Sequence, residues 1–95
     1  MKKVVTSPAV DIALRSLDAE GVRKVHAWFN HLQNWDNDEF VRNRSHSLEG
    51  FSDVYVLRTS TDIRIFFKIE GNTITVLDVA TKRAIMTSGA VPEAG

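Results

Sequence analysis

The sequence contains no cysteine among its 95 residues, which excludes disulfide frameworks, thiolate catalysis and cysteine-ligated zinc or iron–sulfur centres. It also lacks an excess of either charge, because 12 Lys and Arg residues balance 12 Asp and Glu residues. This balance argues against non-specific coating of nucleic acid. No apolar run approaches the roughly 20 residues that cross a bilayer, so we expect a soluble, cytoplasmic protein without membrane contact. His26 and His31 lie five residues apart, a spacing that does not suit zinc, and we expect no metal and no cofactor.

What remains is enough for one small domain. A chain of 95 residues with 43% hydrophobic residues is ordinary for a folded protein and leaves no room for a second core. We expect the domain to span residues 1–86 and residues 87–95 to form a flexible tail. A domain of this size is marginally stable and can lean on a partner.

The first half of the chain has the period of helices. After a short β-prone piece at residues 2–6, Ser7 and Pro8 are typical of an N-cap and a first helical position. Asp18 predicts the start of a second helix, whose apolar residues recur at spacings of three and four as far as Trp35. The two helices would form an antiparallel pair. Residues 34–47 are polar and predict only a connection.

The second half changes to the period of strands. Strands are predicted at residues 53–59, 63–70 and 73–79, and Gly71 with Asn72 is a tight-hairpin signal between the last two. The resulting order, β-α-α-β-β-β, defines an α+β domain. Its helix pair covers one face of a curled, mainly antiparallel sheet, and the other face is expected to stay open.

Alternation along these strands assigns side chains to the two faces. If Ile65 and Phe67 face the helices, their neighbours point to the open face. The side chains expected there are Arg58, Arg64, Phe66 and Lys68, with Lys82 and Arg83 just beyond the last strand. The fold would thus gather cations that the balanced composition hides.

The stretch from Leu48 to Arg83 resembles the RelE/ParE superfamily of bacterial toxins. It runs Leu48-Glu-Gly, a strand ending in Arg58, then Ile63-Arg-Ile-Phe-Phe-Lys, and a last strand followed by Lys-Arg. Family members have a Leu-x-Gly, a strand ending in basic residues, an arginine that opens the next strand, and an arginine after the last. The order of strands and helices agrees as well, so the resemblance covers residues 2–86.

The resemblance implies the toxin of a type II toxin–antitoxin pair, with a cognate antitoxin as partner and a homodimer or a hetero-oligomer as its assembly. RelE-type members cut mRNA in the ribosomal A site without a metal, whereas ParE-type members inhibit DNA gyrase. The positions that match the family's arginines are Arg58, Arg64 and Arg83.

Cleavage of RNA by its own 2′-hydroxyl needs a base, a group that stabilises the charged phosphate, and an acid. Arginines suit the second task, because the guanidinium fork matches phosphate oxygens. His46 is the candidate for proton transfer, with Glu49 as the alternative. Lys68 and Lys82 are expected to bind RNA, and Phe66 to stack on a base.

A second hypothesis is a toxin that acts by binding a protein, either ParE-like or as a catalytically degenerate relative. Val56 occupies a position where a ribosome-cutting member would have lysine, and neither tyrosine nor histidine follows Arg83. Whether the chain is an enzyme therefore depends on which of the two hypotheses holds.

Overall fold

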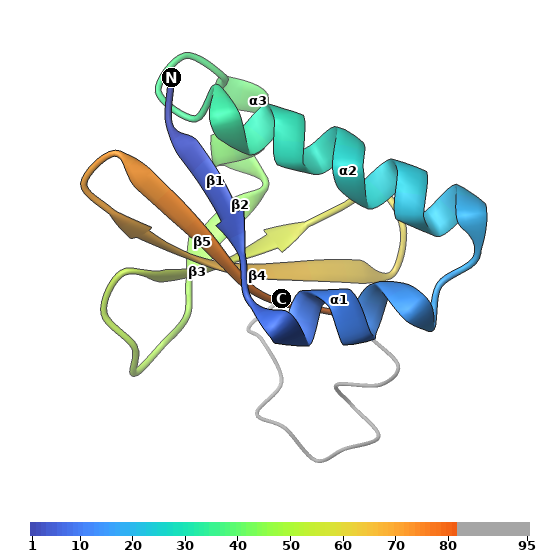
Figure 1. Cartoon of the computed structure of the whole chain (residues 1–95). Coiled ribbons are helices and arrows are strands. Elements are labelled where there is room, and N and C mark those ends of the chain that lie inside the picture. Colours follow the sequence, from blue (N-terminus) through green and yellow to red (C-terminus); the bar gives the residue numbers. More distant parts are fainter. Residues whose placement is uncertain (82–95) are drawn as a thin grey trace.

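The computed structural model describes residues 1–81 as an α+β domain in which three helices pack on one five-stranded mixed sheet (Figure 1). The predicted fold class is confirmed. The sheet order is β1-β5-β4-β3-β2, with β1 parallel to β5 and the other pairs antiparallel. The elements are β1 (Lys3–Thr6), α1 (Pro8–Arg15), α2 (Ala19–Gln33), α3 (Glu39–Asn43), β2 (Ser45–Ser47), β3 (Val54–Arg58), β4 (Ile63–Glu70) and β5 (Thr73–Thr81). The predicted tail and the predicted domain end at residue 86 lie outside the described residues.

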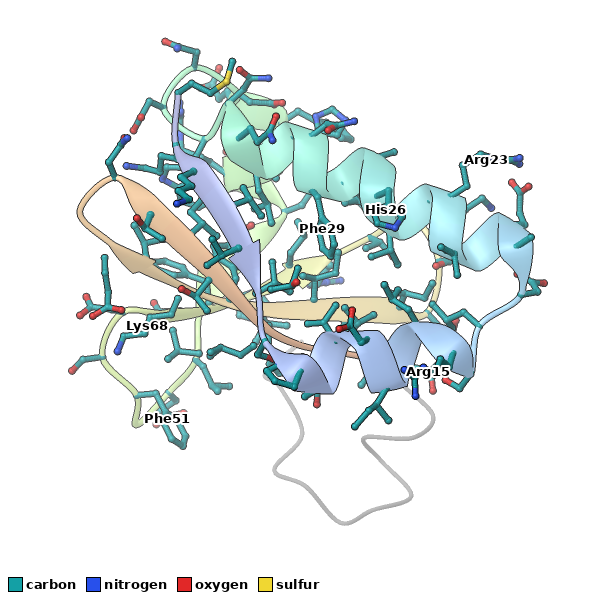
Figure 2. The ribbon with its side chains drawn as sticks, viewed as in Figure 1. Arg15, Arg23, His26, Phe29, Phe51 and Lys68 are labelled. Carbon is teal, nitrogen blue, oxygen red and sulfur yellow. The ribbon has the colours of Figure 1, made fainter. Side chains whose placement is uncertain are left out.

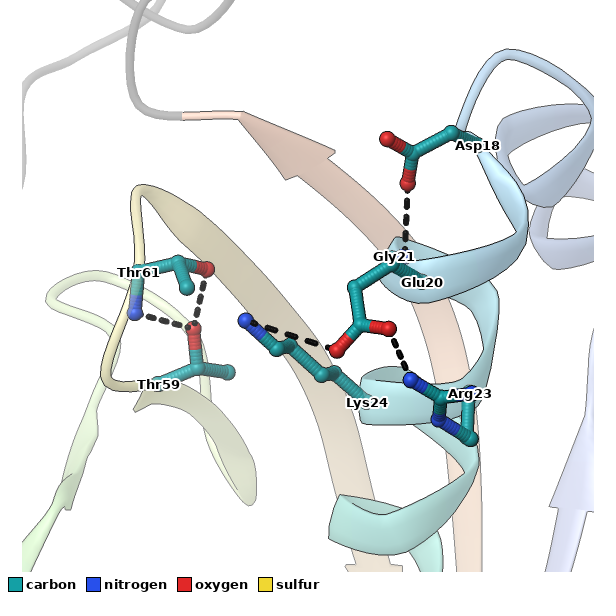
Figure 3. Close-up of polar contacts among 7 residues, drawn as sticks. All are labelled: Asp18, Glu20, Gly21, Arg23, Lys24, Thr59 and Thr61. Carbon is teal, nitrogen blue, oxygen red and sulfur yellow. Dashed lines mark hydrogen bonds and ion pairs between the residues drawn. The ribbon is translucent and has the colours of Figure 1, made fainter.

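Both long helices begin where the sequence predicts. The carboxylate of Asp18 accepts a hydrogen bond from the backbone N–H of Gly21 at 2.7 Å, which caps α2 (Figure 3). Ser7 occupies the N-cap position of α1, but its hydroxyl donates to the carbonyl of Leu77 at 2.7 Å instead of capping the helix. That bond ties the start of α1 to β5. None of the described helices is long and apolar enough to cross a membrane.

The polar stretch at residues 34–47 is more structured than predicted. It contains α3, whose N-cap Asp38 accepts from the backbone N–H of Val41 at 3.1 Å, and β2, which pairs antiparallel with β3. Five and three residues are too few to show a helical or a strand period, so the composition hid both elements. Their effect is to bring this stretch against the end of β3.

The β4–β5 hairpin turns at Gly71, whose φ of 58° is the left-handed value that glycine adopts freely. The strands pair over their whole length, with a register shift between Phe66 and Phe67. β5 continues to Thr81, two residues beyond its predicted end.

The core lies between the helices and one face of the sheet. Phe67 is fully buried, stacks on Tyr55 at 5.5 Å between ring centroids, and meets Trp35 edge-on at 5.6 Å. From α2, the ring of Phe29 points toward the sheet (Figure 2). The other buried apolar residues of this core are Val10, Val25, Trp28, Leu32, Val41, Leu57, Ile63, Ile65, Ile74, Val76 and Val79.

The opposite face of the sheet is less open than predicted. Val56 is fully buried and Arg64 is only 6% exposed, although both point away from the helices. Val56 lies between His46 on β2 and Phe66 on β4, which oppose it in register. Charge reaches the solvent on this face at Arg58, at Asp78, which opposes Phe66 on β5, and near Lys68.

Candidate functional site

A polar pocket of about 210 Å³ lies where the end of α3, β2 and the end of β3 meet. It is lined by Asn43, Arg44, Ser45, His46 and Arg58. Two arginines and a histidine therefore share one hollow, and none of these five lining residues is acidic. Such a pocket favours an anion.

Arg58 reaches the pocket because it is the last residue of β3. Its backbone N–H donates to the carbonyl of Arg44 at 2.9 Å, which extends the β2–β3 pairing by one bond. The side chain is exposed, so its guanidinium can meet a ligand. Across the other edge of the strand, Arg58 opposes Arg64 in register, and opposed residues of an antiparallel pair project to the same side.

The structure places Arg64, a predicted catalytic residue, at the turn between β3 and β4. Its Nη1 donates to the carbonyls of Thr61 and Ile63, at 3.1 and 3.2 Å. The same turn is closed by the contact between the Thr59 and Thr61 hydroxyls at 3.2 Å (Figure 3). The buried guanidinium therefore helps to hold the β3–β4 turn in place, and Arg64 is not among the residues that line the pocket.

Arg44 is the functional candidate that sequence reasoning missed. Its guanidinium carbon lies 5.7 Å from the Trp28 ring centroid and 5.6 Å from that of Phe40, and its Nε donates to the carbonyl of Arg58 at 2.8 Å. A cation over an aromatic ring is attracted to it, so these contacts fix the side chain at the rim of the pocket. The sequence carries no periodic signal for Arg44, because it is the C-cap of the five-residue α3 and precedes the three-residue β2.

His46 lies on β2 opposite Val56 and lines the pocket, as Arg58 does. Its Nε2 is buried, so a proton transfer in the pocket would have to use Nδ1. The alternative proton carrier, Glu49, is exposed in the loop that follows β2 and is not part of the pocket lining.

The predicted RNA-binding residues lie farther along the sheet. Phe66 opposes Val56, and Lys68 opposes Val54, where it forms an ion pair with Glu70 at 3.5 Å. Figure 2 shows Lys68 near the loop that carries Phe51. Lys68 lies four positions after Arg64 on β4, a distance of roughly 13 Å along the strand. The two side chains would therefore meet different parts of an extended ligand. Lys82 and Arg83 lie outside the described residues.

The aromatic neighbours of the pocket include His31, which is hydrogen-bonded to Asp38. Nδ1 of His31 and Oδ2 of Asp38 lie 2.7 Å apart, which links α2 to the start of α3. This hydrogen bond, followed by the one from the Val41 N–H, lowers the pKa of Asp38 below its ordinary value, because both stabilise the charged carboxylate. Among residues 1–81, no group of three His, Cys, Asp or Glu side chains is arranged to hold a metal ion.

The fold is that of RelE toxins. The structure superposes with a TM-score of 0.71 on a chain of the RelB–RelE antitoxin–toxin complex of Methanococcus jannaschii, at 14% identity, covering 88% of this chain and 96% of that one. A chain of the Escherichia coli DinJ–YafQ complex superposes with a TM-score of 0.69 at 13% identity, covering 90% of this chain and 98% of that one. A chain of the archaeal RelE–RelB complex of Pyrococcus horikoshii superposes with a TM-score of 0.65 at 21% identity, covering 84% of this chain and 93% of that one.

No protein-family model and no curated protein matches the sequence. The structural similarity confirms the resemblance to RelE toxins at the level of the fold. At these low identities, residues of the pocket must be judged by their own geometry.

Proposed function

We propose that this protein is the toxin of a toxin–antitoxin pair and that it acts in the cytoplasm as a RelE-like, ribosome-dependent mRNA endonuclease. The fold supports the class, since the similar structures are toxins and toxin–antitoxin complexes. The observation that carries the activity is the pocket, which unites His46 and Arg58 from two strands with Arg44. The partners are then a cognate antitoxin, the ribosome and mRNA.

The pocket can serve a metal-independent cleavage as follows. The 2′-hydroxyl of one nucleotide attacks the adjacent phosphorus, the bond to the 5′-oxygen breaks, and a cyclic phosphate results. Arg58 and Arg44 would hold the phosphate oxygens, where negative charge develops in the transition state. His46 would take the 2′ proton or deliver one to the leaving 5′-oxygen.

One imidazole supplies only one of the two proton transfers. The second must come from the ribosome or from another residue of this chain, and the former would explain dependence on the ribosome. General acid–base catalysis contributes about 10²–10⁴-fold, so the isolated protein should cut free RNA slowly.

Induced expression in a bacterial host tests the proposal. Growth should stop, and primer extension should show cuts in the ribosomal A site that Arg58→Ala abolishes. The control is Arg23→Ala, which removes an equal charge from the end of α2 remote from α3 (Figure 2), where Arg23 pairs with Glu20. Intact mRNA in arrested cells would refute the nuclease.

The alternative is a toxin that binds a protein without cleaving RNA, such as a ParE-like inhibitor of gyrase. It is favoured by Val56, which puts a buried apolar side chain beside His46 where a cutting enzyme would benefit from a cation. A supercoiling assay with purified gyrase decides for this alternative if inhibition occurs in the absence of RNA cleavage.

A further inference from the structure

Phe40 is an exposed aromatic residue that the pocket does not include. It is 53% exposed, although it lies parallel to the buried Trp28, with 5.6 Å between ring centroids and 12° between ring planes. His31 lies 5.7 Å from the same ring. The Phe40 ring thus packs against Trp28 and His31, while more than half of the residue is exposed to solvent.

The backbone around Phe40 is also fixed. Asp38 caps α3 by accepting from the Val41 N–H and is bonded to His31 on α2. Because α3 is capped and hydrogen-bonded to α2, the Phe40 ring loses little conformational freedom when a ligand stacks on it, which favours binding.

Phe40 and the pocket share one side chain. The guanidinium carbon of Arg44 lies 5.6 Å from the Phe40 centroid, and Arg44 is one of the residues that line the pocket with His46 and Arg58. A flat apolar ring therefore stands next to an anion-binding hollow. This is the pair of features that a nucleotide requires, one for the base and one for the phosphate.

The surroundings favour a nucleotide over a protein partner. The large hydrophobic side chains exposed on the described part of the chain are Met1 before β1, Ile12 on α1, Phe40 on α3 and Phe51 in the loop after β2. A specific protein interface buries at least about 1,000 Å² and has an apolar centre, which one isolated ring does not supply.

We propose that Phe40, steadied by Trp28 and Arg44, is a stacking platform for one nucleobase of a single-stranded RNA whose phosphate lies against Arg44 and Arg58. This inference rests on the proposed function and adds to it a subsite on α3. Stacking tolerates any base, so the platform would position the strand without selecting its sequence.

The test is the affinity of the purified protein for two fluorescent strands, a short uridine oligonucleotide and an abasic strand of equal length. Because stacking on an aromatic ring stabilises a bound base, wild type should bind the uridine strand about tenfold more tightly than the abasic strand. Phe40→Ala and Phe40→Leu should lose that preference while binding the abasic strand as wild type does. The leucine variant is expected to keep an apolar contact with Trp28. The control is Phe51→Ala, which removes another exposed ring, from the loop after β2, and should not change the affinity for either strand.

The stacking platform would be refuted if wild type bound the uridine and the abasic strand with equal affinity. It would also be refuted if Phe40→Leu lowered the affinity for the two strands by the same factor. Neither result touches the proposed nuclease, which is judged by A-site cuts that depend on Arg58. Conversely, a uridine preference that requires Phe40 would stand even if no mRNA were cut.

Discussion

Arg44 and Arg58 each bond to the other's backbone carbonyl: the Arg58 N–H donates to the carbonyl of Arg44 at 2.9 Å, and Nε of Arg44 donates to the carbonyl of Arg58 at 2.8 Å. The reciprocal bonds join the end of α3 to the end of β3. They also hold two arginines at one pocket, although their like charges repel each other. The cationic site is therefore a product of backbone pairing.

This relationship predicts that Arg44 contributes to stability and that lysine cannot replace it. Arg44→Ala should lower the free energy of unfolding by about 1 kcal/mol, because one charge-assisted hydrogen bond and a partly exposed cation–π contact are lost. Arg44→Lys keeps the positive charge but has no guanidinium group, and so no Nε–H to donate to the Arg58 carbonyl. The lysine variant should therefore recover only part of the lost stability. Urea denaturation followed by tryptophan fluorescence measures both, and full stability in the lysine variant would contradict the prediction.

Arg64→Ala is expected to destabilise the fold more than Arg58→Ala does. The buried Arg64 guanidinium donates to two carbonyls of the β3–β4 turn, and its loss should cost about 2 kcal/mol. The side chain of Arg58 is exposed, and its truncation should change stability by less than about 0.5 kcal/mol. Denaturation midpoints of the two variants check the order.

The consequence for activity is specific. A loss of toxicity in Arg64→Ala should be accompanied by a lower amount of folded protein, whereas the loss in Arg58→Ala should occur at an unchanged amount. If Arg64→Ala is as stable as wild type, its buried role in the turn is wrong.

The strongest sequence signals were regular periods and the residues that begin helices or form tight turns. The start of α2 at Asp18, the alternation of β4 and the hairpin at Gly71 were predictable because each depends on local geometry. α3 and β2 were not, since such short elements form only when neighbouring strands and helices support them. Burial of Arg64 and Val56 was missed for a related reason: alternation assigns a side chain to a face but says nothing of what covers that face.

The candidate site was half predictable. Arg58 and His46 were chosen for their chemistry, but only the register of β2 on β3 shows that they line one pocket. Arg44 escaped notice because a lone arginine in a polar stretch has no periodic signature. Its significance depends on Trp28 and Phe40, which come from two different helices.

The turn at Gly71 provides a prediction that is independent of the site. Because φ is 58° there, Gly71→Ala should lower the free energy of unfolding by about 1 kcal/mol. A Cβ at this position would have no atom within 4 Å, so the cost is backbone strain alone. Gly71→Asn should cost less, since asparagine tolerates this region, and equal destabilisation by both would contradict the explanation.

The His31–Asp38 pair predicts how the pocket responds to acid. The pKa of Asp38 is lowered in the folded protein, first by the hydrogen bond with His31 and then by the Val41 N–H. A carboxylate whose folded pKa lies below its unfolded value, about 3.9, contributes stability that is complete above that value. The contribution is lost as the pH falls through the folded pKa.

His31→Ala should therefore raise the pKa of Asp38 toward its ordinary value, and carbon NMR of the carboxyl group measures the change directly. The stability difference between this variant and wild type should shrink as the pH falls below about 4, because wild type then loses the same interaction. Asp38 caps the helix that ends at Arg44, so acid should loosen α3, and with it the pocket, before the β4–β5 hairpin. Hydrogen exchange at low pH would show this order, and an Asp38 titration identical in wild type and His31→Ala would refute the coupling.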